Sequence, residues 1–129
     1  MPRRSTPRPT DSELDILRVL WRRGPSTVRE VYETLNRKRP TGYTTVLKML
    51  QIMTEKQLVE REESQRAHVY EARLPQEQTQ QQLVGDLLER AFDGSAKKLV
   101  MQALSSKKAS SEDLTEIREL LDRFERGAK

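Results

Sequence analysis

The chain of 129 residues has no cysteine and only one histidine. Without cysteine it can form neither disulfides nor thiolate metal sites. The lone His68 has no partner motif for catalysis, and we interpret it as a surface or cross-strand residue. No apolar run approaches the roughly 20 residues that span a bilayer. No apolar segment follows the basic start MPRRSTPRPT either, so we expect no membrane insertion, no secretory signal and a cytoplasmic location.

Motifs for enzymatic chemistry are missing as well. The sequence has no phosphate-cradling glycine loop, no His-Glu metal helix and no nucleophile elbow. Solvation and the dipole of a helix start explain the adjacent carboxylates Glu62-Glu63 and Glu112-Asp113. We therefore predict a protein that is not an enzyme and that needs neither a cofactor nor a metal.

Apolar residues are scarce for a chain of this length, at 34%, and charged residues also make up 34%. A small chain with so little apolar material often completes its core against a second copy. The net charge of +4 is uneven: residues 1–74 hold 15 Lys+Arg against 10 Asp+Glu, whereas residues 75–129 hold 9 against 10. This asymmetry fits a first half that meets phosphates and a second that meets protein, and a solvated mixed-charge surface explains it equally well.

The first part of the chain is punctuated by helix signals. Residues 1–9 are basic and rich in proline, so we expect a disordered arm that either frays or follows DNA. Thr10 and Thr27 each stand three residues before a glutamate, which is the spacing of a capping box. The first helix should therefore begin at Thr10 and the second at Ser26 or Thr27, and Gly24-Pro25 and Pro40 should end them.

Two features of the second helix suggest phosphate contacts. Its exposed start at Ser26-Thr27 could hold a phosphate through free N–H groups and the helix dipole. The basic turn NRKRP follows it, and its residues Arg37, Lys38 and Arg39 either contact phosphates or form a solvated loop.

Residues 41–74 carry the most informative pattern. An apolar stripe predicts a helix with one buried face, formed by Val46, Met49, Leu50 and Met53. The opposite face presents polar side chains of modest length, namely Tyr43, Thr44, Thr45, Lys48 and Gln51. Two short strands, residues 58–62 and 68–73, flank a polar tip at residues 63–66. A polar helix face followed by an arginine-tipped hairpin suits the major groove and its flanking phosphates, as in a winged helix-turn-helix.

From Gln76 the sequence is wholly helical. Amphipathic stripes at residues 83–92, 99–104 and 114–124 predict three short helices whose apolar faces cannot form a dry core alone. An interlocked homodimer would cover them, and paired half-sites on DNA call for two-fold symmetry as well. The predicted interface residues are Leu87, Leu88, Leu99, Ile117, Leu120, Leu121 and Phe124.

Three segments resemble the penicillinase-repressor family: DSELDILRVLW (11–21), YTTVLKMLQIMTEKQLV (43–59) and RAHVYEARLP (66–75). The helical C-terminal pattern fits too. The family contains repressors of beta-lactamase, methicillin-resistance and copper-transport operons. The resemblance implies a mainly α fold, with a disordered arm at 1–9, a winged-helix DNA-binding domain at 10–75 and a three-helix dimerisation domain at 76–129.

The resemblance also implies repression by a homodimer bound to a dyad-symmetric, double-stranded operator. The DNA-binding residues that follow from it are Thr41, Tyr43, Thr44, Thr45, Leu47, Lys48 and Arg66. Of these, Leu47 either contacts a thymine methyl or is a partly buried helix residue. A membrane sensor or protease acting upstream is a further implied partner.

Two departures from the family bear on induction. Copper-type members carry a cysteine motif that this chain lacks. The beta-lactamase branch is cleaved at an Asn-Phe junction, where this chain has Gln102-Ala103. The inducing signal therefore stays open.

A winged helix that binds protein instead of DNA is the competing hypothesis. Acidic residues in place of Lys48, Arg66 and the NRKR turn would favour it, and this sequence has basic residues there. We therefore favour a bacterial transcriptional repressor.

Overall fold

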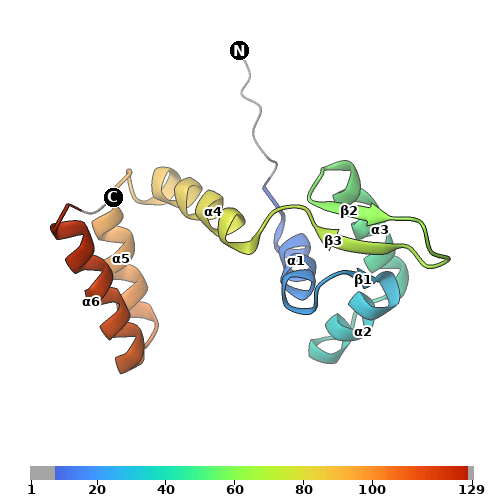
Figure 1. The fold of residues 1–129 in the computed structure, drawn as a ribbon, viewed down its shortest axis with the longest axis horizontal. Helices are drawn as coiled ribbons and strands as arrows, with labels where there is room; N and C mark the ends of the chain where they lie inside the picture. The colour runs from blue at the N-terminus through green and yellow to red at the C-terminus, as the bar shows by residue number, and fades with distance from the viewer. Residues whose placement is uncertain (1–7, 128–129) are drawn as a thin grey trace, which may run out of the picture. The chain divides into compact units, whose positions relative to one another are not determined.

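The computed structural model describes residues 8–127, and the chain separates into two compact units after Val84 (Figure 1). Residues 1–7 of the predicted arm lie outside the described residues. The first unit contains α1 (Asp11–Arg23), β1 (Ser26–Thr27), α2 (Val28–Lys38), α3 (Tyr43–Glu55), β2 (Val59–Glu62), β3 (Val69–Ala72) and the start of α4 (Gln76–Ala91). The second unit contains the end of α4, α5 (Ala96–Ser106) and α6 (Ser111–Glu125).

Capping boxes start α1 and α2 at the two threonines that the sequence indicated. Thr10 Oγ1 accepts a hydrogen bond from Glu13 N at 3.2 Å, and Glu13 Oε1 accepts one from Thr10 N at 3.0 Å. Thr27 and Glu30 make the same pair of bonds, and a third box starts α6. Gly24 ends α1 with a φ of 90°, a region that glycine enters without steric cost. These helix starts are confirmed.

The wing belongs to a three-stranded antiparallel sheet with strand order β1-β3-β2. Arg61 of β2 pairs with Tyr70 of β3, and Ser26 of β1 pairs with Tyr70 from the other side. No sequence pattern predicted β1, and the two predicted wing strands, residues 58–62 and 68–73, are slightly longer than β2 and β3. A strand of two residues is too short to show alternation, and its partner lies far along the chain, so no local pattern could have indicated it.

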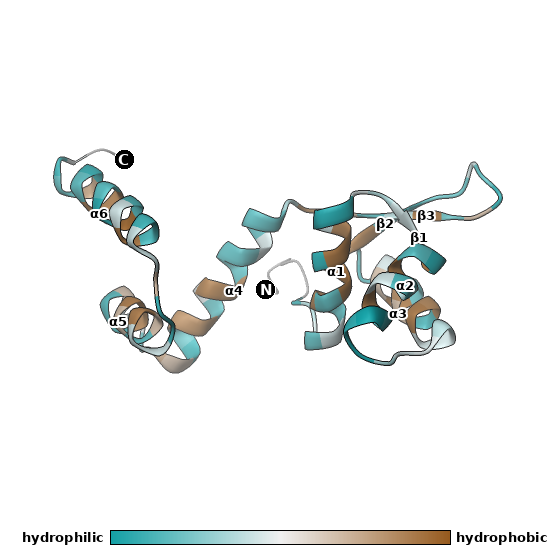
Figure 2. Ribbon diagram, turned by 90° about the horizontal axis from the view of Figure 1, so that it is seen from below, coloured by the Kyte–Doolittle hydropathy of each residue, from teal (hydrophilic) through white to brown (hydrophobic). Residues whose placement is uncertain are grey.

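The core lies entirely in the first unit. Its buried apolar residues come from α1, α2, α3 and the strands: Ile16, Leu17, Val19, Leu20, Val28, Val31, Val46, Leu50, Met53, Leu58, Val59 and Tyr70. Figure 2 shows the hydrophobic side of α1 turned toward α2 and α3. Trp21 is half-buried against this core, and its Nε1 donates to the carbonyl oxygen of Leu74 at 3.0 Å, which ties down the segment that enters α4. Three helices with a small sheet and a wing confirm the predicted mainly α, winged helix-turn-helix fold.

The second unit is wholly helical, as the sequence predicted, yet none of its described residues (85–127) has a buried side chain. Figure 2 shows hydrophobic and hydrophilic residues alternating along α5 and α6. The helices are therefore amphipathic without burying their apolar sides within the unit. Within residues 8–127 no helix combines the length and the hydropathy that a membrane span requires.

Candidate nucleic-acid interface

The buried stripe of α3 determines which of its side chains face solvent. Val46, Leu50 and Met53 are each at most 1% exposed, so this side of the helix is fully inside the core. Residues that alternate with them around the helix must then point outward. The outward-facing residues include Thr44, Thr45, Lys48 and Gln51, all of which are exposed. The first unit thus presents a polar helix face on a rigid support.

The structure places most of the predicted DNA-binding residues on or just before α3. Thr41 lies half-buried in the turn before the helix, and its N–H donates to Asn36 Oδ1 at 3.0 Å. Leu47 is also half-buried and packs against the core, which leaves less of it for a base contact. Arg66 does not join this group along α3, because it lies exposed in the loop between β2 and β3.

Tyr43 begins α3 inside an aromatic and cationic cluster that no sequence pattern predicted. Its ring meets that of Tyr32 edge to face, with centroids 5.7 Å apart and an angle of 73° between the planes. The guanidinium carbon of Arg29 lies 5.2 Å from the centroid of the Tyr43 ring, within the range of cation–π attraction. Both partners come from α2, so the cluster fixes the start of α3 against the preceding helix. Arg29 had no sequence signal beyond its place in the first turn of α2.

The other end of α3 is braced by a partly buried ion pair. Lys56 Nζ, just past the helix, lies 2.8 Å from Glu13 Oε1 and 3.0 Å from Oε2. Burial of Glu13 by itself would raise the pKa of its carboxyl group. The hydrogen bonds from Lys56 and from the Thr10 backbone outweigh burial, so the pKa is lowered from its ordinary 4.5. Glu13 therefore stays ionised and ties α3 to α1.

The cations around the interface fall into two groups. Arg39 in the basic turn lies 2.8 Å from Asp15 Oδ2, and Arg61 on the wing lies 2.6 Å from Glu63 Oε2. Hydrogen bonding to Tyr70 and then to Glu63 raises the pKa of Arg61. Lys48 and Arg66 have no ion-pair partner within residues 8–127, and both are exposed. They remain available to an external anion.

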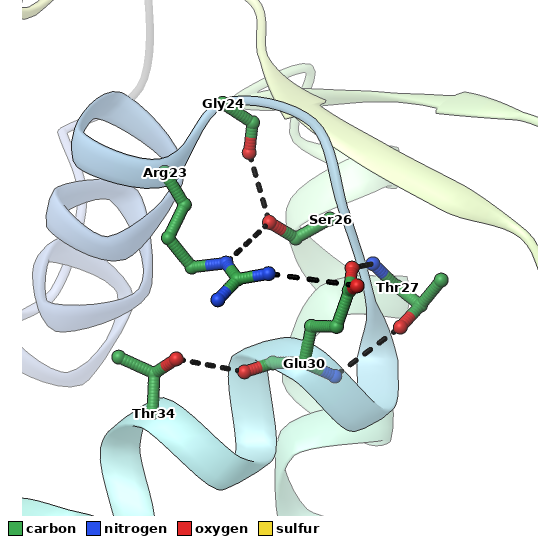
Figure 3. A network of polar contacts seen from close by, with 6 residues as sticks. All are labelled: Arg23, Gly24, Ser26, Thr27, Glu30 and Thr34. Atoms are coloured by element: carbon green, nitrogen blue, oxygen red, sulfur yellow. Dashed lines mark hydrogen bonds and ion pairs between the residues drawn. The ribbon is translucent and has the colours of Figure 1, made fainter.

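The start of α2 does not fit the phosphate site that the sequence suggested. Figure 3 shows that Glu30 Oε1 already accepts from Thr27 N at 2.9 Å, while its other carboxylate oxygen lies 3.5 Å from Arg23. Arg23 Nε also donates to Ser26 Oγ at 3.2 Å, and Ser26 is 1% exposed. A carboxylate occupies the place that a phosphate would take, so this prediction is wrong.

The residues predicted for a dimer interface lie on the three C-terminal helices. Leu88 and Leu99 are half-buried, as is Ile117. The remaining four are more exposed, at 41–62% for the members on α6 and 44% for the member on α4: Leu87, Leu120, Leu121 and Phe124. Such large apolar side chains stay available for burial by another surface.

Comparison with known proteins agrees with this geometry. Residues 9–123 match the model of the family described as penicillinase repressor. The chain belongs to the penicillinase-repressor family. The resemblance found in the sequence is confirmed.

Relatives within this family are bacterial. The chain is 34% identical over 92 residues to the transcriptional regulator BlaI of Mycobacterium tuberculosis (strain CDC 1551 / Oshkosh), an alignment that covers 70% of this chain and 67% of the relative. It is 22% identical over 116 residues to the penicillinase repressor of Bacillus licheniformis, which covers 90% of this chain and 91% of that one.

A solved structure is similar to the first unit's fold. It is the solution structure of the DNA binding domain of the repressor BlaI, with a TM-score of 0.51 and 22% identity. The match covers 57% of this chain and 90% of the solved chain. At that identity the likeness bears on the fold, and it confirms the winged-helix arrangement.

Proposed function

We propose that this chain represses transcription as a homodimer bound to a dyad-symmetric DNA operator in the bacterial cytoplasm. Membership of the penicillinase-repressor family makes it a DNA-binding transcriptional repressor. The homodimer, the symmetry of the operator and the residues in contact are the finer parts of the proposal. The observation that carries the proposed DNA contacts is the exposed polar face of α3, held on a closed core.

The proposed contacts follow from the size and chemistry of α3. An α-helix fits into the major groove, which is about 12 Å wide. The hydroxyls of Thr44 and Thr45 can donate to and accept from base edges, and Lys48 can reach either a base or a phosphate. Thr41 and Tyr43 lie at the start of the same helix. We assign phosphate contact beside the groove to Arg66 on the wing, and a thymine methyl contact to the exposed part of Leu47.

The homodimer rests on the apolar side chains of α4, α5 and α6. They are spaced like the inner face of amphipathic helices, yet the second unit buries none of them. A second copy of the same helices offers a complementary apolar surface through two-fold symmetry. Such a dimer presents two α3 helices, which calls for an operator with two related half-sites. A membrane sensor or protease acting upstream would relieve the repression.

The first test is binding of the purified full chain to the DNA upstream of its own gene, titrated with salt, against a scrambled duplex of equal length. We expect tight binding to the upstream DNA with two protomers per site, and an affinity that falls steeply with salt. The scrambled duplex should bind far more weakly. Equal and weak binding to both duplexes would contradict the proposal and favour a winged helix that binds protein.

A further inference from the structure

A groove of about 470 Å³ runs between α1 and the segment that joins α2 to α3. Its walls come from one side of α1, the last turn of α2, the turn at residues 39–41 and the first turns of α3. Small-molecule sites in proteins typically enclose roughly 300–1,000 Å³. The groove is therefore large enough for a small ligand, and it lies wholly within the first unit.

The floor of the groove is apolar. Val19 and Val46 line it from the buried core, while Leu35 and Met49 are half-buried and so keep part of their surface open to the groove. An aliphatic or aromatic body lying on these side chains would remove apolar surface from water on both sides, which favours binding.

The rim of the groove is strongly basic. Five of its lining residues are arginine or lysine. The groove is also lined by one carboxylate, that of Asp15, and it is already paired with Arg39 at 2.8 Å. Arg23 is paired with Glu30. Arg18, Arg22 and Lys38 are exposed and have no ion-pair partner within residues 8–127. Arginine binds carboxylates and phosphates through two parallel hydrogen bonds, so this rim suits an anion.

We propose that this groove is an effector site for a small amphipathic anion, with an aromatic or aliphatic body and a carboxylate or phosphate group. The apolar body lies on Leu35 and Met49, and the anionic group meets Arg18 and Arg22. Neither a neutral ligand of the same shape nor a purely polar anion would satisfy both parts of the groove.

A ligand in the groove would lie next to part of the proposed DNA-binding face. Thr41 and Thr45 line the groove and are also proposed DNA contacts. A bound anion adds negative charge to the groove and so repels the phosphates that the start of α3 would approach. The ligand therefore lowers affinity for DNA, which is the behaviour of an inducer. This effect rests on the proposed function, whereas binding of the ligand itself does not.

The four methionines of the chain give a direct readout of binding. Met49 lines the groove, while Met101 is 58% exposed on α5 in the other unit and reports unspecific contact with apolar surface. We would label the methyl groups of methionine with ¹³C in the full chain and titrate 1-naphthaleneacetate, with 1-naphthaleneacetamide as the neutral probe of the same shape. We expect the Met49 signal to shift and saturate with the acid, the Met101 signal to stay in place, and the amide to bind at least about fivefold more weakly.

Variants locate the anionic part of the site. The double variant Arg18→Ala/Arg22→Ala should weaken binding of 1-naphthaleneacetate about tenfold, because two charge-assisted hydrogen-bonding groups are removed. Both arginines are exposed, so the fold should be retained. Arg118→Ala on α6 removes an arginine of the second unit that is also exposed, and it should leave binding unchanged. Saturating acid should also raise the Kd for the upstream DNA about fivefold in the parent.

The proposal is overturned if Met49 does not shift, if Met49 and Met101 shift together without saturation, or if the acid and the amide bind equally. A protein that binds 1-naphthaleneacetate at Met49 but no DNA would contradict the proposed function and leave the ligand site standing. A protein that binds DNA but shows no Met49 shift would contradict the ligand site and leave the proposed function standing.

Discussion

The first unit of the chain buries a set of apolar side chains in a core, whereas every apolar side chain of the second unit, within residues 85–127, is at least partly exposed. Within residues 8–127, the twelve buried apolar residues all lie from Ile16 to Tyr70. In the second unit several large apolar side chains remain open to solvent, with Phe124 at 62% and Met101 at 58%. Both units have helices with good caps and regular amphipathic spacing. Local helix signals therefore do not tell whether a helix closes a core within its own chain.

The strongest expected difference between the units concerns stability. Leu50→Ala removes a side chain that is 0% exposed, so the free energy of unfolding of the first unit should fall by about 2–5 kcal/mol. Leu121→Ala removes one that is 54% exposed, and in dilute protein it should change that free energy by less than about 0.5 kcal/mol. Urea unfolding followed by the fluorescence of Trp21, the one tryptophan of the chain, measures the first unit alone. If both variants lost the same free energy of unfolding at low protein concentration, the difference in burial between the two units would not decide their stability.

A second prediction concerns the exposed apolar side chains of α6, which we expect to be buried in the dimer. Leu120→Asp or Phe124→Asp puts a charge into the apolar side of α6, so the dimer Kd should rise on the order of a hundredfold. Thr115→Asp is the matched control, because it adds the same charge to the same helix at an exposed polar position. Sedimentation equilibrium on dilution measures the effect. If both aspartate variants stay as dimeric as the parent, α6 is not the interface.

The Glu13–Lys56 ion pair predicts a pH dependence that belongs to the first unit. The pKa of Glu13 is lower in the folded chain than its ordinary 4.5, so the unfolded chain binds this proton more readily. The pair's stabilisation is therefore present above about pH 4.5 and is lost as the pH falls through the lower folded value. Glu13→Gln should reduce stability by about 1–2 kcal/mol at pH 7 and should flatten the acid limb of the stability curve.

The control for that ion pair is Glu63→Gln on the wing tip, where the carboxylate is 54% exposed. It should leave the Trp21-detected transition nearly unchanged at every pH. An acid limb that stays as steep in Glu13→Gln as in the parent would show that other carboxylates cause it.

Local signals in the sequence predicted most of the fold. Thr10 and Thr27 mark helix starts because a capping box is complete within four residues. The strand β1, the Glu13–Lys56 pair and the Tyr43 cluster were out of reach, because each depends on a partner elsewhere in the fold. The phosphate site at the start of α2 failed for a related reason. The same glutamate that signals the cap fills the site, and Arg23 holds it there.

The candidate interface was indicated by a different kind of signal. The polar face of α3 could be predicted from spacing, because a buried stripe fixes the opposite side. Which cations remain available could not be predicted, since Arg39 is paired with Asp15, a residue far along the sequence, and Lys48 has no such partner within residues 8–127. The groove between α1 and α3 likewise joins side chains that are scattered along the sequence.

The smallest predicted effect distinguishes two readings of Lys48. Lys48→Ala should weaken binding to the upstream DNA, and if the ammonium meets a phosphate the slope of log K against log salt should fall by about one unit. Lys108→Ala removes a lysine of the second unit that is also exposed, and because that unit is expected to meet protein and not DNA, it should leave the slope unchanged. An unchanged slope with an altered base preference would place Lys48 on a base edge instead. If both variants lost the same affinity for DNA, the second unit would also contact DNA, and the proposed separation of DNA binding and dimerisation between the units would be wrong.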